Sequence, residues 1–346
     1  MTPAARVASP SFTTDPDILA AHARDVSGIV GTPDALVRPA TVAEIVEVVA
    51  QACGTQTALT PIGMQSATTG AAIAPRGWLL STCRMSRILD VDRRRGVAIC
   101  EPGVVLADLK REVAAAGWSY PPDPTSEDEC TLGGTIATNA SGARSLRYGS
   151  TRAWVEGIEV VTGDGAIIDL HRPRVDKQSA GFAAFSNLVD LFVGSEGTLG
   201  VITRVHVRLS PRPAGVGGVL AYFDDVASAL RAVPAVRATR GLRPRCCELL
   251  DAWSLGVWRH EGPRIRVPAD AGAALYLEEE TPGQWSHTQL GRWERLLGRA
   301  GARVSESVVV EDAGSLREIR RLRHAVPSTF NRLAEAYVAA GGGKVG

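Results

Sequence analysis

Residues 130–149, CTLGGTIATNASGARSLRYG, are the most informative stretch of this 346-residue sequence. They contain four glycines among short runs of alanine, serine, threonine and asparagine. The stretch has too few large apolar side chains for a core segment, and a structureless loop of this length is uncommon in a compact domain unless it serves a function. Its composition predicts main chain that is held in place so that a ligand can approach it closely.

Two other segments share this composition: residues 60–70, TPIGMQSATTG, and residues 194–203, GSEGTLGVIT. Successive N–H groups in such turns form concave anion sites, so the three segments together predict a site for a long ligand that carries a pyrophosphate. Neither GxxxxGK[ST] nor a GxGxxG after the first strand is present, which argues against a P-loop or a Rossmann domain. For each segment taken alone, a simple turn is the alternative.

Periodicity and turn residues predict an α+β fold in two domains. Thr41 and Glu44 form a capping box before an amphipathic helix that runs to residue 52. The other predicted elements of the first domain are strands at 57–61, 78–81, 88–92 and 96–101, a helix at 104–117, a hairpin that turns at 163–165 and a strand at 200–209. A change of composition at residues 212–218 predicts a boundary, which gives a flexible tail (1–14), a first domain (15–211) and a second domain (212–346).

With 38 basic and 37 acidic residues, the net charge of +1 gives no reason to expect nucleic acid or an anionic membrane as a partner. The sequence shows no secretory leader and no apolar run near the ~20 residues of a membrane span, so no transmembrane segment is expected. The six cysteines lack CxxC spacing and the six histidines lack ligand spacing. We therefore expect a cytoplasmic protein without a disulfide framework or a metal site.

In order and spacing, the segments resemble the PCMH-type FAD-binding domain of the vanillyl-alcohol oxidase superfamily, in its glycolate and D-lactate dehydrogenase-like branch. The resemblance is specific over residues 15–211 and weaker to the end of the chain. It is carried by ARDVSG (23–28), VRPATVAEIVEVV (37–49), the loop at 61–70, EPGVVLADLKREVAAAG (101–117), YPPDPTSEDECTLGGTIATNASGARSLRYGSTR (120–152) and GSEGTLGVIT. It implies a two-subdomain FAD-binding domain followed by an incomplete α+β substrate domain, or cap.

The resemblance also implies which residues line the FAD. In the first loop these are Pro61, Ile62, Gly63, Met64, Gln65, Ser66 and Ala67. In the second segment they are Ser126, Thr131, Gly133, Gly134, Thr138 and Gly142, with Gly133 and Gly134 letting main chain approach the cofactor. In the third segment they are Glu196, Val201 and Ile202. Met64 and Gln65 stand where relatives usually have glycine or threonine. No histidine lies between His22 and His171, so the resemblance implies noncovalent FAD.

Substrate contacts are implied near the end of the chain, in LREIRRLRHAVPSTF (316–330) and beyond. Arg323 and Lys344 match the family's carboxylate-binding arginine and lysine, and a guanidinium suits a carboxylate because it binds in a bidentate fork. A solvated basic helix face is the alternative for Arg323. His324, beside it, is the one candidate for the base. The family's His-x-Gly-Asp-Gly-Asn-like segment would follow Lys344 and is not in the sequence, so we expect a truncated chain.

The function implied is FAD-dependent oxidation of a 2-hydroxy acid of the D-lactate or glycolate type, by hydride transfer to flavin N5. The chain would then be truncated or completed by another subunit. A flavin-binding subunit that relays electrons to an acceptor, or that scaffolds a complex without oxidising substrate itself, is the first alternative. A non-catalytic remnant that binds little is the second.

Overall fold

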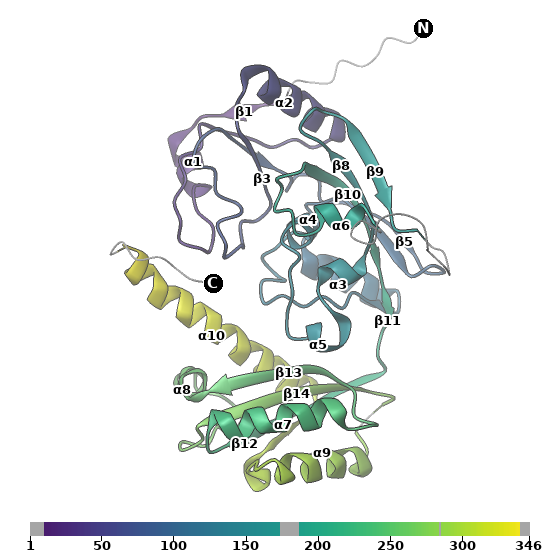
Figure 1. Ribbon diagram of the computed structural model, residues 1–346, viewed down its shortest axis with the longest axis vertical. Helices are drawn as coiled ribbons and strands as arrows, with labels where there is room; N and C mark the ends of the chain where they lie inside the picture. Colours follow the sequence, from purple (N-terminus) through teal and green to yellow (C-terminus); the bar gives the residue numbers. More distant parts are fainter. Residues whose placement is uncertain (1–9, 174–186, 284, 340–346) are drawn as a thin grey trace. The chain divides into compact units, whose positions relative to one another are not determined.

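The computed structural model describes residues 10–173, 187–283 and 285–339, which form two compact units (Figure 1). The first unit contains residues 10–140 and 150–211. The second contains residues 212–339 together with the short segment 141–149. Both units mix helices with β-sheets, as the sequence predicts.

The first sheet of the first unit has the order β1-β2-β4-β3. Its strands are β1 (Phe12–Thr13), β2 (Ala35–Val37), β4 (Trp78–Ser81) and β3 (Leu59–Ile62). Strands β2, β4 and β3 run parallel, and α2 (Val42–Thr55) follows β2 in the chain. The predicted start of α2 is confirmed, because the Thr41 hydroxyl accepts a hydrogen bond from the Glu44 N–H at 3.2 Å. The Glu44 carboxylate accepts from the N–H of Ala40, at 2.7 Å.

The end of the predicted tail is ordered. Phe12 and Thr13 form β1, which pairs antiparallel with β2, and the ring of Phe12 packs against Trp78 with centroids 4.6 Å apart. Two residues of the predicted tail, Phe12 and Thr13, thus pair with the first sheet. A two-residue strand is too short to show a period, and its aromatic partner is distant in the sequence.

The second sheet of the first unit is antiparallel, with the order β5-β6-β10-β8-β9. Its strands are β5 (Ile88–Asp92), β6 (Val97–Cys100), β10 (Val201–Arg208), β8 (Val155–Val161) and β9 (Ile167–His171). The hairpin predicted at 163–165 is confirmed as the β8–β9 connection. The remaining elements of this unit are α1 (Pro16–Ala21), α3 (Leu106–Ala115), β7 (Trp118–Ser119), α4 (Leu132–Ala137), a 3-10 turn (Thr151–Trp154), α6 (Val189–Phe192) and β11 (Ser210–Pro211).

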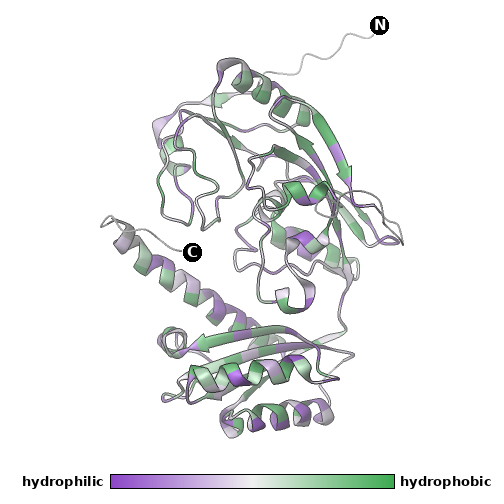
Figure 2. Cartoon of the chain, viewed as in Figure 1, coloured by the Kyte–Doolittle hydropathy of each residue, from purple (hydrophilic) through white to green (hydrophobic). Residues whose placement is uncertain are grey.

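The second unit is built on an antiparallel sheet with the order β13-β14-β12-β15. These strands are β13 (Pro244–Asp251), β14 (Ala273–Thr281), β12 (Gly215–Phe223) and β15 (Val308–Val310). Helices α7 (Val226–Ala238) and α9 (His287–Arg299) cover one face, and α8 (Ala252–His260) and α10 (Ala313–Ala339) cover the other (Figure 1). Figure 2 shows hydrophobic and hydrophilic residues mixed along α9 and α10, as expected for helices with one face on a sheet.

Two covered faces explain why β12 is almost continuously buried. Val219, Ala221 and Phe223 face the α7–α9 core, while Leu220 and Tyr222 face the α8–α10 core. The glycines at 215, 217 and 218, which follow the start of the second unit at residue 212, lie in the first part of this strand. A Cβ at Gly217 would lie 1.9 Å from Trp285 Nε1, so the glycine makes room for a buried ring.

The segment 141–149 packs with the second unit, although it directly continues the stretch 130–140 of the first. It contains α5 (Ser145–Tyr148). Arg147 lies 3.3 Å from the Glu280 carboxylate, the Tyr148 hydroxyl donates to the same carboxylate, and Ala143 packs against the α8–α10 core. A first domain that continues unbroken from 15 to 211 is therefore not observed, because long-range charge pairs hold this segment to another sheet.

Glu318 gives the second unit a testable pH dependence. Its carboxylate accepts hydrogen bonds from Arg321 at 2.9 Å and from the Arg264 N–H at 2.8 Å. Arg321 is the main cause that lowers the pKa of Glu318 from 4.5 to about 2. The stabilisation is thus present above pH ~4.5 and is lost as the pH falls toward 2.

We expect Glu318→Gln to lower the free energy of unfolding at pH 6 by about 1 kcal/mol, a modest value because Arg321 is exposed. Urea titrations at pH 6 and pH 3 would measure this difference. The gap between the variant and the parent should narrow at pH 3. A gap of equal size at both pH values would contradict the assignment.

Candidate functional site

The first glycine-rich loop begins where β3 ends and meets the second segment at Gly63. A Cβ at Gly63 would lie 2.3 Å from Thr131 Oγ1, so only glycine allows the loop to come this close. Thr131 is buried and caps α4, its hydroxyl accepting from the Gly134 N–H at 3.2 Å. The contact joins two segments that are far apart in the chain.

Gln65 explains how this loop tolerates a departure from the family's pattern. Its φ is +55°, the left-handed region that glycine usually occupies. The side-chain amide donates to the carbonyl oxygens of His22, at 2.8 Å, and Ala72, at 3.3 Å. These bonds hold the loop in a conformation for which a glycine would otherwise be expected.

The loop also presents a row of main-chain donors. Among the residues that the structure describes, none accepts a hydrogen bond from the N–H groups of residues 64–69. Met64 is 45% exposed, which leaves this face of the loop open. Such a row of free N–H groups beside a glycine is the main-chain arrangement that binds phosphate oxygens.

The second segment forms the short helix α4, and the structure gives a different reason for its glycines from the predicted one. A Cβ at Gly133 would lie 2.6 Å from the Cβ of Pro102, and one at Gly134 would lie 3.0 Å from Thr131 Oγ1. The Gly133 N–H also donates to the Pro102 carbonyl oxygen at 2.7 Å. These glycines serve close packing within the protein.

The third segment closes against both of the others. The N–H groups of Gly194 and Glu196 donate to the carbonyl oxygens of Ile136 and Ala137, at 3.0 and 2.8 Å. A Cβ at Gly197 would lie 3.3 Å from the ring of Pro61. The Thr69 hydroxyl lies 3.4 Å from the Glu196 carboxylate. The first and third segments therefore meet residues 130–140 of the second segment within the first unit.

The other predicted cofactor residues are spread over this neighbourhood. Val201 is buried in β10 opposite Val161, and its neighbour Ile202 pairs with Val160. Ile62 is buried at the end of β3, Ser66, Ala67 and Ser126 are half-buried, and Thr138 is exposed. Gly142 belongs to the second unit, where its N–H donates to Ser145 Oγ at 3.0 Å.

Sequence reasoning missed the residues that brace the third segment. Asn139 has φ +48°, and its side-chain oxygen accepts from the Arg152 N–H at 2.9 Å. The Arg152 guanidinium donates to the Asp190 carboxylate at 2.9 Å and to the Val193 carbonyl oxygen. The hydrogen bond from Arg172 is the main cause that lowers the pKa of Asp190, and the hydrogen bond from Arg152 lowers it further. The sequence signal for this feature was an asparagine within a run of small residues, because asparagine tolerates the left-handed conformation.

The predicted substrate residues lie in the second unit. Arg323, on α10, is bound to the Glu248 carboxylate of β13 through two of its nitrogens, with Nη2 at 3.0 Å. Its neighbour His324 is half-buried, and the His324 carbonyl oxygen accepts from the Ser328 hydroxyl at 2.9 Å. Lys344 lies outside the described residues.

Within the described ranges, no group of three or more histidine, cysteine or carboxylate side chains is arranged to hold a metal ion. No helix in those ranges is long and apolar enough to cross a membrane. All six cysteines are free thiols, and burial raises the pKa of Cys130 to about 11.

Two family models match the sequence. The FAD binding domain matches residues 33–171, and the C-terminal domain of FAD linked oxidases matches residues 213–343. Together they cover most of both units.

Similar curated proteins include the glycolate oxidase subunit GlcD of Bacillus subtilis, 33% identical over 84% of this chain and 60% of its own length. A D-2-hydroxyglutarate dehydrogenase of Stutzerimonas stutzeri is 34% identical over 63% of the chain and 47% of its own length. A D-lactate dehydrogenase of Anaerostipes hadrus is 34% identical over 63% and 45%. The chain thus spans about half the length of these relatives.

Among solved structures, an alkyldihydroxyacetonephosphate synthase superposes with a TM-score of 0.71 at 21% identity. The match covers 92% of this chain and 62% of that one. At this identity the likeness concerns the fold alone.

Proposed function

The chain belongs to the FAD-linked oxidoreductases that carry a PCMH-type FAD-binding domain, and on this basis we propose that it oxidises a 2-hydroxy acid of the D-lactate or glycolate type. The matched domains identify FAD as the cofactor. The observation that supports the proposal most directly is that the first and third glycine-rich segments meet residues 130–140 within the first unit.

The first unit fits this cofactor. The free N–H groups of residues 64–69 would hold the diphosphate, with Gly63 against Thr131 keeping the loop in place. The braced third segment would close beside it through Glu196. When bound, FAD supplies a hydride acceptor at flavin N5. No histidine stands in these segments, so the attachment would be noncovalent.

In the second unit, the Arg323 guanidinium, on a side chain that is 11% exposed, is engaged by a protein carboxylate. It binds that of Glu248 through two nitrogens, and we infer that a substrate carboxylate takes the place of Glu248. Lys344 would be a second cation for the same group. The imidazole of His324 would accept the hydroxyl proton of the substrate, because the pKa of a histidine lies near the working pH.

The test is a visible spectrum of the purified chain, followed by anaerobic mixing with D-lactate, glycolate or D-2-hydroxyglutarate. A yellow protein whose absorbance near 450 nm bleaches with one of these acids is expected. A chain that stays colourless after addition of FAD would exclude any flavin function. A yellow chain that no hydroxy acid bleaches would favour the alternative, an electron-relay or scaffold subunit.

Arg323→Gln should lower kcat/KM for the bleaching acid by about 100-fold, since a bidentate charged contact is lost. Arg317→Gln is the matched control, because Arg317 is an exposed arginine on the same helix. Equal effects of the two substitutions would remove Arg323 from the substrate site.

The proposal includes a cytoplasmic location, since six unpaired thiols suit a reducing compartment. It also includes a further subunit that completes the site or accepts the electrons. Co-purification of the flavin-loaded chain with the products of neighbouring genes would test this part.

A further inference from the structure

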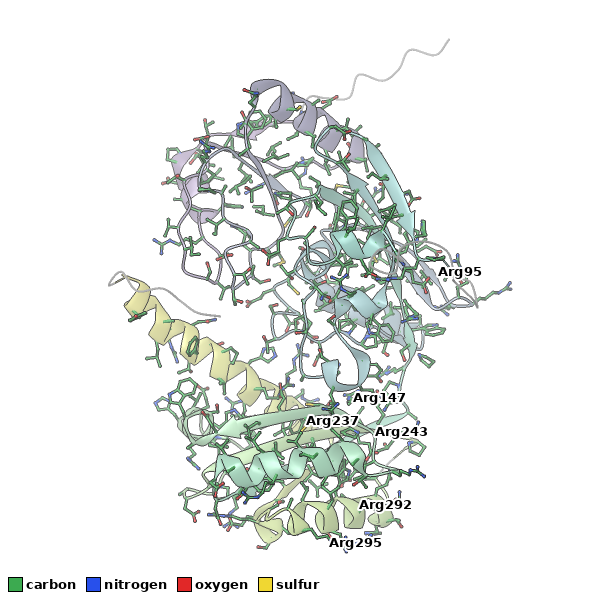
Figure 3. All side chains as sticks on the ribbon, viewed as in Figure 1. Arg95, Arg147, Arg237, Arg243, Arg292 and Arg295 are labelled. Carbon is green, nitrogen blue, oxygen red and sulfur yellow. The ribbon has the colours of Figure 1, made fainter. Side chains whose placement is uncertain are left out.

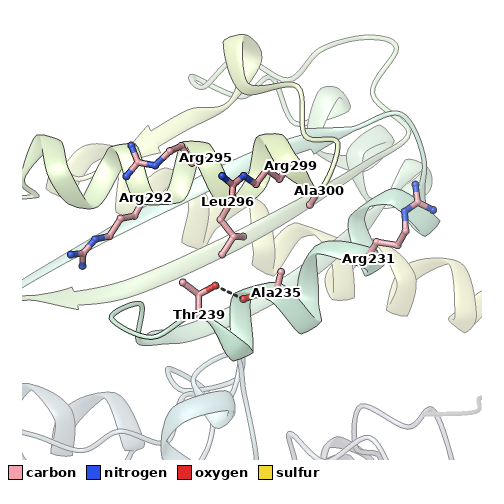
Figure 4. Close-up of a pocket in the computed structure, with 8 residues that line it drawn as sticks. All are labelled: Arg231, Ala235, Thr239, Arg292, Arg295, Leu296, Arg299 and Ala300. Atoms are coloured by element: carbon pink, nitrogen blue, oxygen red, sulfur yellow. Dashed lines mark hydrogen bonds between the residues drawn. The ribbon is translucent and has the colours of Figure 1, made fainter.

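A groove of about 480 Å³ runs between α7 and α9 on the outer side of the second unit's sheet (Figure 4). Four arginines line it: Arg231 from α7, and Arg292, Arg295 and Arg299 from α9. Its apolar lining residues include Ala235, which is exposed, and Leu296, which is half-buried. Both helices belong to one unit, and their inner faces share one hydrophobic core.

Helices α7 and α9, together with the residues that follow α7, carry an excess of positive charge, although the net charge of the whole chain is only +1. Residues 226–243 contain four arginines and no acidic residue, and α9 contains three arginines and one glutamate. Figure 3 shows Arg237, Arg243, Arg292 and Arg295 in these segments. In the described part of the chain, none of the four groove arginines forms an ion pair with a carboxylate.

Other arginines of the same unit are neutralised. Arg245 pairs with Glu278, Arg303 with Asp224, and Arg321 with Glu318. The described lining of the groove contains no carboxylate, whereas these other arginines of the unit are paired with carboxylates. Such a cationic groove is complementary to an anionic ligand.

The spacing of the charges decides what kind of anion fits. Arg292, Arg295 and Arg299 lie three and four residues apart, so they share one face of α9 and extend along it for about 10 Å. Figure 4 shows the guanidinium groups spread along the groove and not pointing to one centre. A single phosphate would be held by converging donors, whereas an extended chain of carboxylates would meet the arginines in turn.

We propose that this groove binds an extended acidic segment of a partner protein. Carboxylates on alternate residues of an extended peptide repeat about every 7 Å, whereas the arginines rise about 4.5 and about 6 Å along the helix axis, a difference that their long side chains can span. Ala235 and Leu296 leave room for the small side chains between the carboxylates. None of the described residues that line the groove is aromatic, although single-stranded nucleic acid usually needs such rings for base stacking.

Fluorescence anisotropy of the full chain with a labelled peptide of about ten alternating glutamate and alanine residues tests the proposal. We expect saturable binding that weakens as salt rises from about 50 to about 300 mM, and no binding of the glutamine analogue. Arg292→Gln/Arg295→Gln/Arg299→Gln should weaken binding at least about tenfold. Glutamine matches arginine in helix propensity, so α9 should remain folded.

The matched control is Arg93→Gln/Arg94→Gln/Arg95→Gln, which removes the same charge from the β5–β6 turn of the other unit. It should change the affinity by less than about twofold. Equal weakening by both variants, or no saturable binding of the glutamate peptide, would overturn the proposal. So would tighter binding of a single-stranded oligonucleotide that the groove variant abolishes. Flavin content is read in parallel, so this result is independent of the proposed oxidase activity.

Discussion

Replacement of Gly63 by alanine is expected to weaken FAD binding by about 10- to 100-fold. The added Cβ would lie 2.3 Å from Thr131 Oγ1, an impossible contact. The threonine side chain cannot simply turn away, because it is buried and its hydroxyl caps α4. The loop must therefore move away from the second segment, and overpacking of this kind costs about 1–3 kcal/mol.

Titration of FAD into the apoprotein, followed by quenching of flavin fluorescence, measures this effect. Gly54→Ala is the matched control: Gly54 lies in α2, and a Cβ there would have no atom within 4 Å. It should leave FAD affinity unchanged and raise stability slightly. Adding Thr131→Ala to Gly63→Ala should recover part of the affinity. If Gly63→Ala binds FAD as the parent does, the loop contact plays no part in holding the cofactor.

The second large effect is expected from Arg245→Met. Arg245 and Glu278 are both buried, and Arg245 Nε lies 2.6 Å from Glu278 Oε2. Burial alone would raise the pKa of Glu278, but Arg245 and Arg144 keep it below its usual value. Without Arg245 the buried carboxylate would keep the hydrogen bond from the Tyr276 hydroxyl, at 2.8 Å, and Arg144, at 3.8 Å, as its one remaining described cation. We expect a loss of about 3 kcal/mol in the free energy of unfolding.

The sign of the pH dependence is diagnostic. In the variant, the pKa of Glu278 should rise above its unfolded value, so the destabilisation should be larger at pH 8 than at pH 5. The double variant Arg245→Met/Glu278→Met should regain most of the loss, because both buried charges are gone. Urea unfolding followed by tryptophan fluorescence would measure all three proteins. A double variant no more stable than the single one would show that packing, and not the unpaired charge, causes the loss.

Local patterns identified many elements of the fold. Strands β4 and β5 lie at the predicted residues, and α2 begins after Thr41 as its capping residues indicate. The strand predicted at 200–209 is β10. Side-chain period, caps and turn residues act over a few neighbouring positions, so the sequence shows them directly.

Contacts between distant residues could not be predicted in this way. The left-handed conformation of Gln65 depends on the carbonyl oxygens of His22 and Ala72. The glycines at 217 and 218 make room for buried neighbours, and their composition indicates only a domain boundary. The groove arginines come from two helices that neighbouring residues alone do not bring together.

Residues 130–149 illustrate both what local sequence predicts and what only the tertiary structure decides. Their small residues and φ-permissive glycines predicted main chain held in close contact with other groups, and their resemblance to the PCMH-type family assigned them to an FAD-binding domain. Only the tertiary structure decided that Gly63 meets Thr131, and that residues 141–149 leave the first unit to pair with Glu278 and Glu280. The physical reason is that steric fit and charge pairing depend on distance in space, and the fold sets that distance.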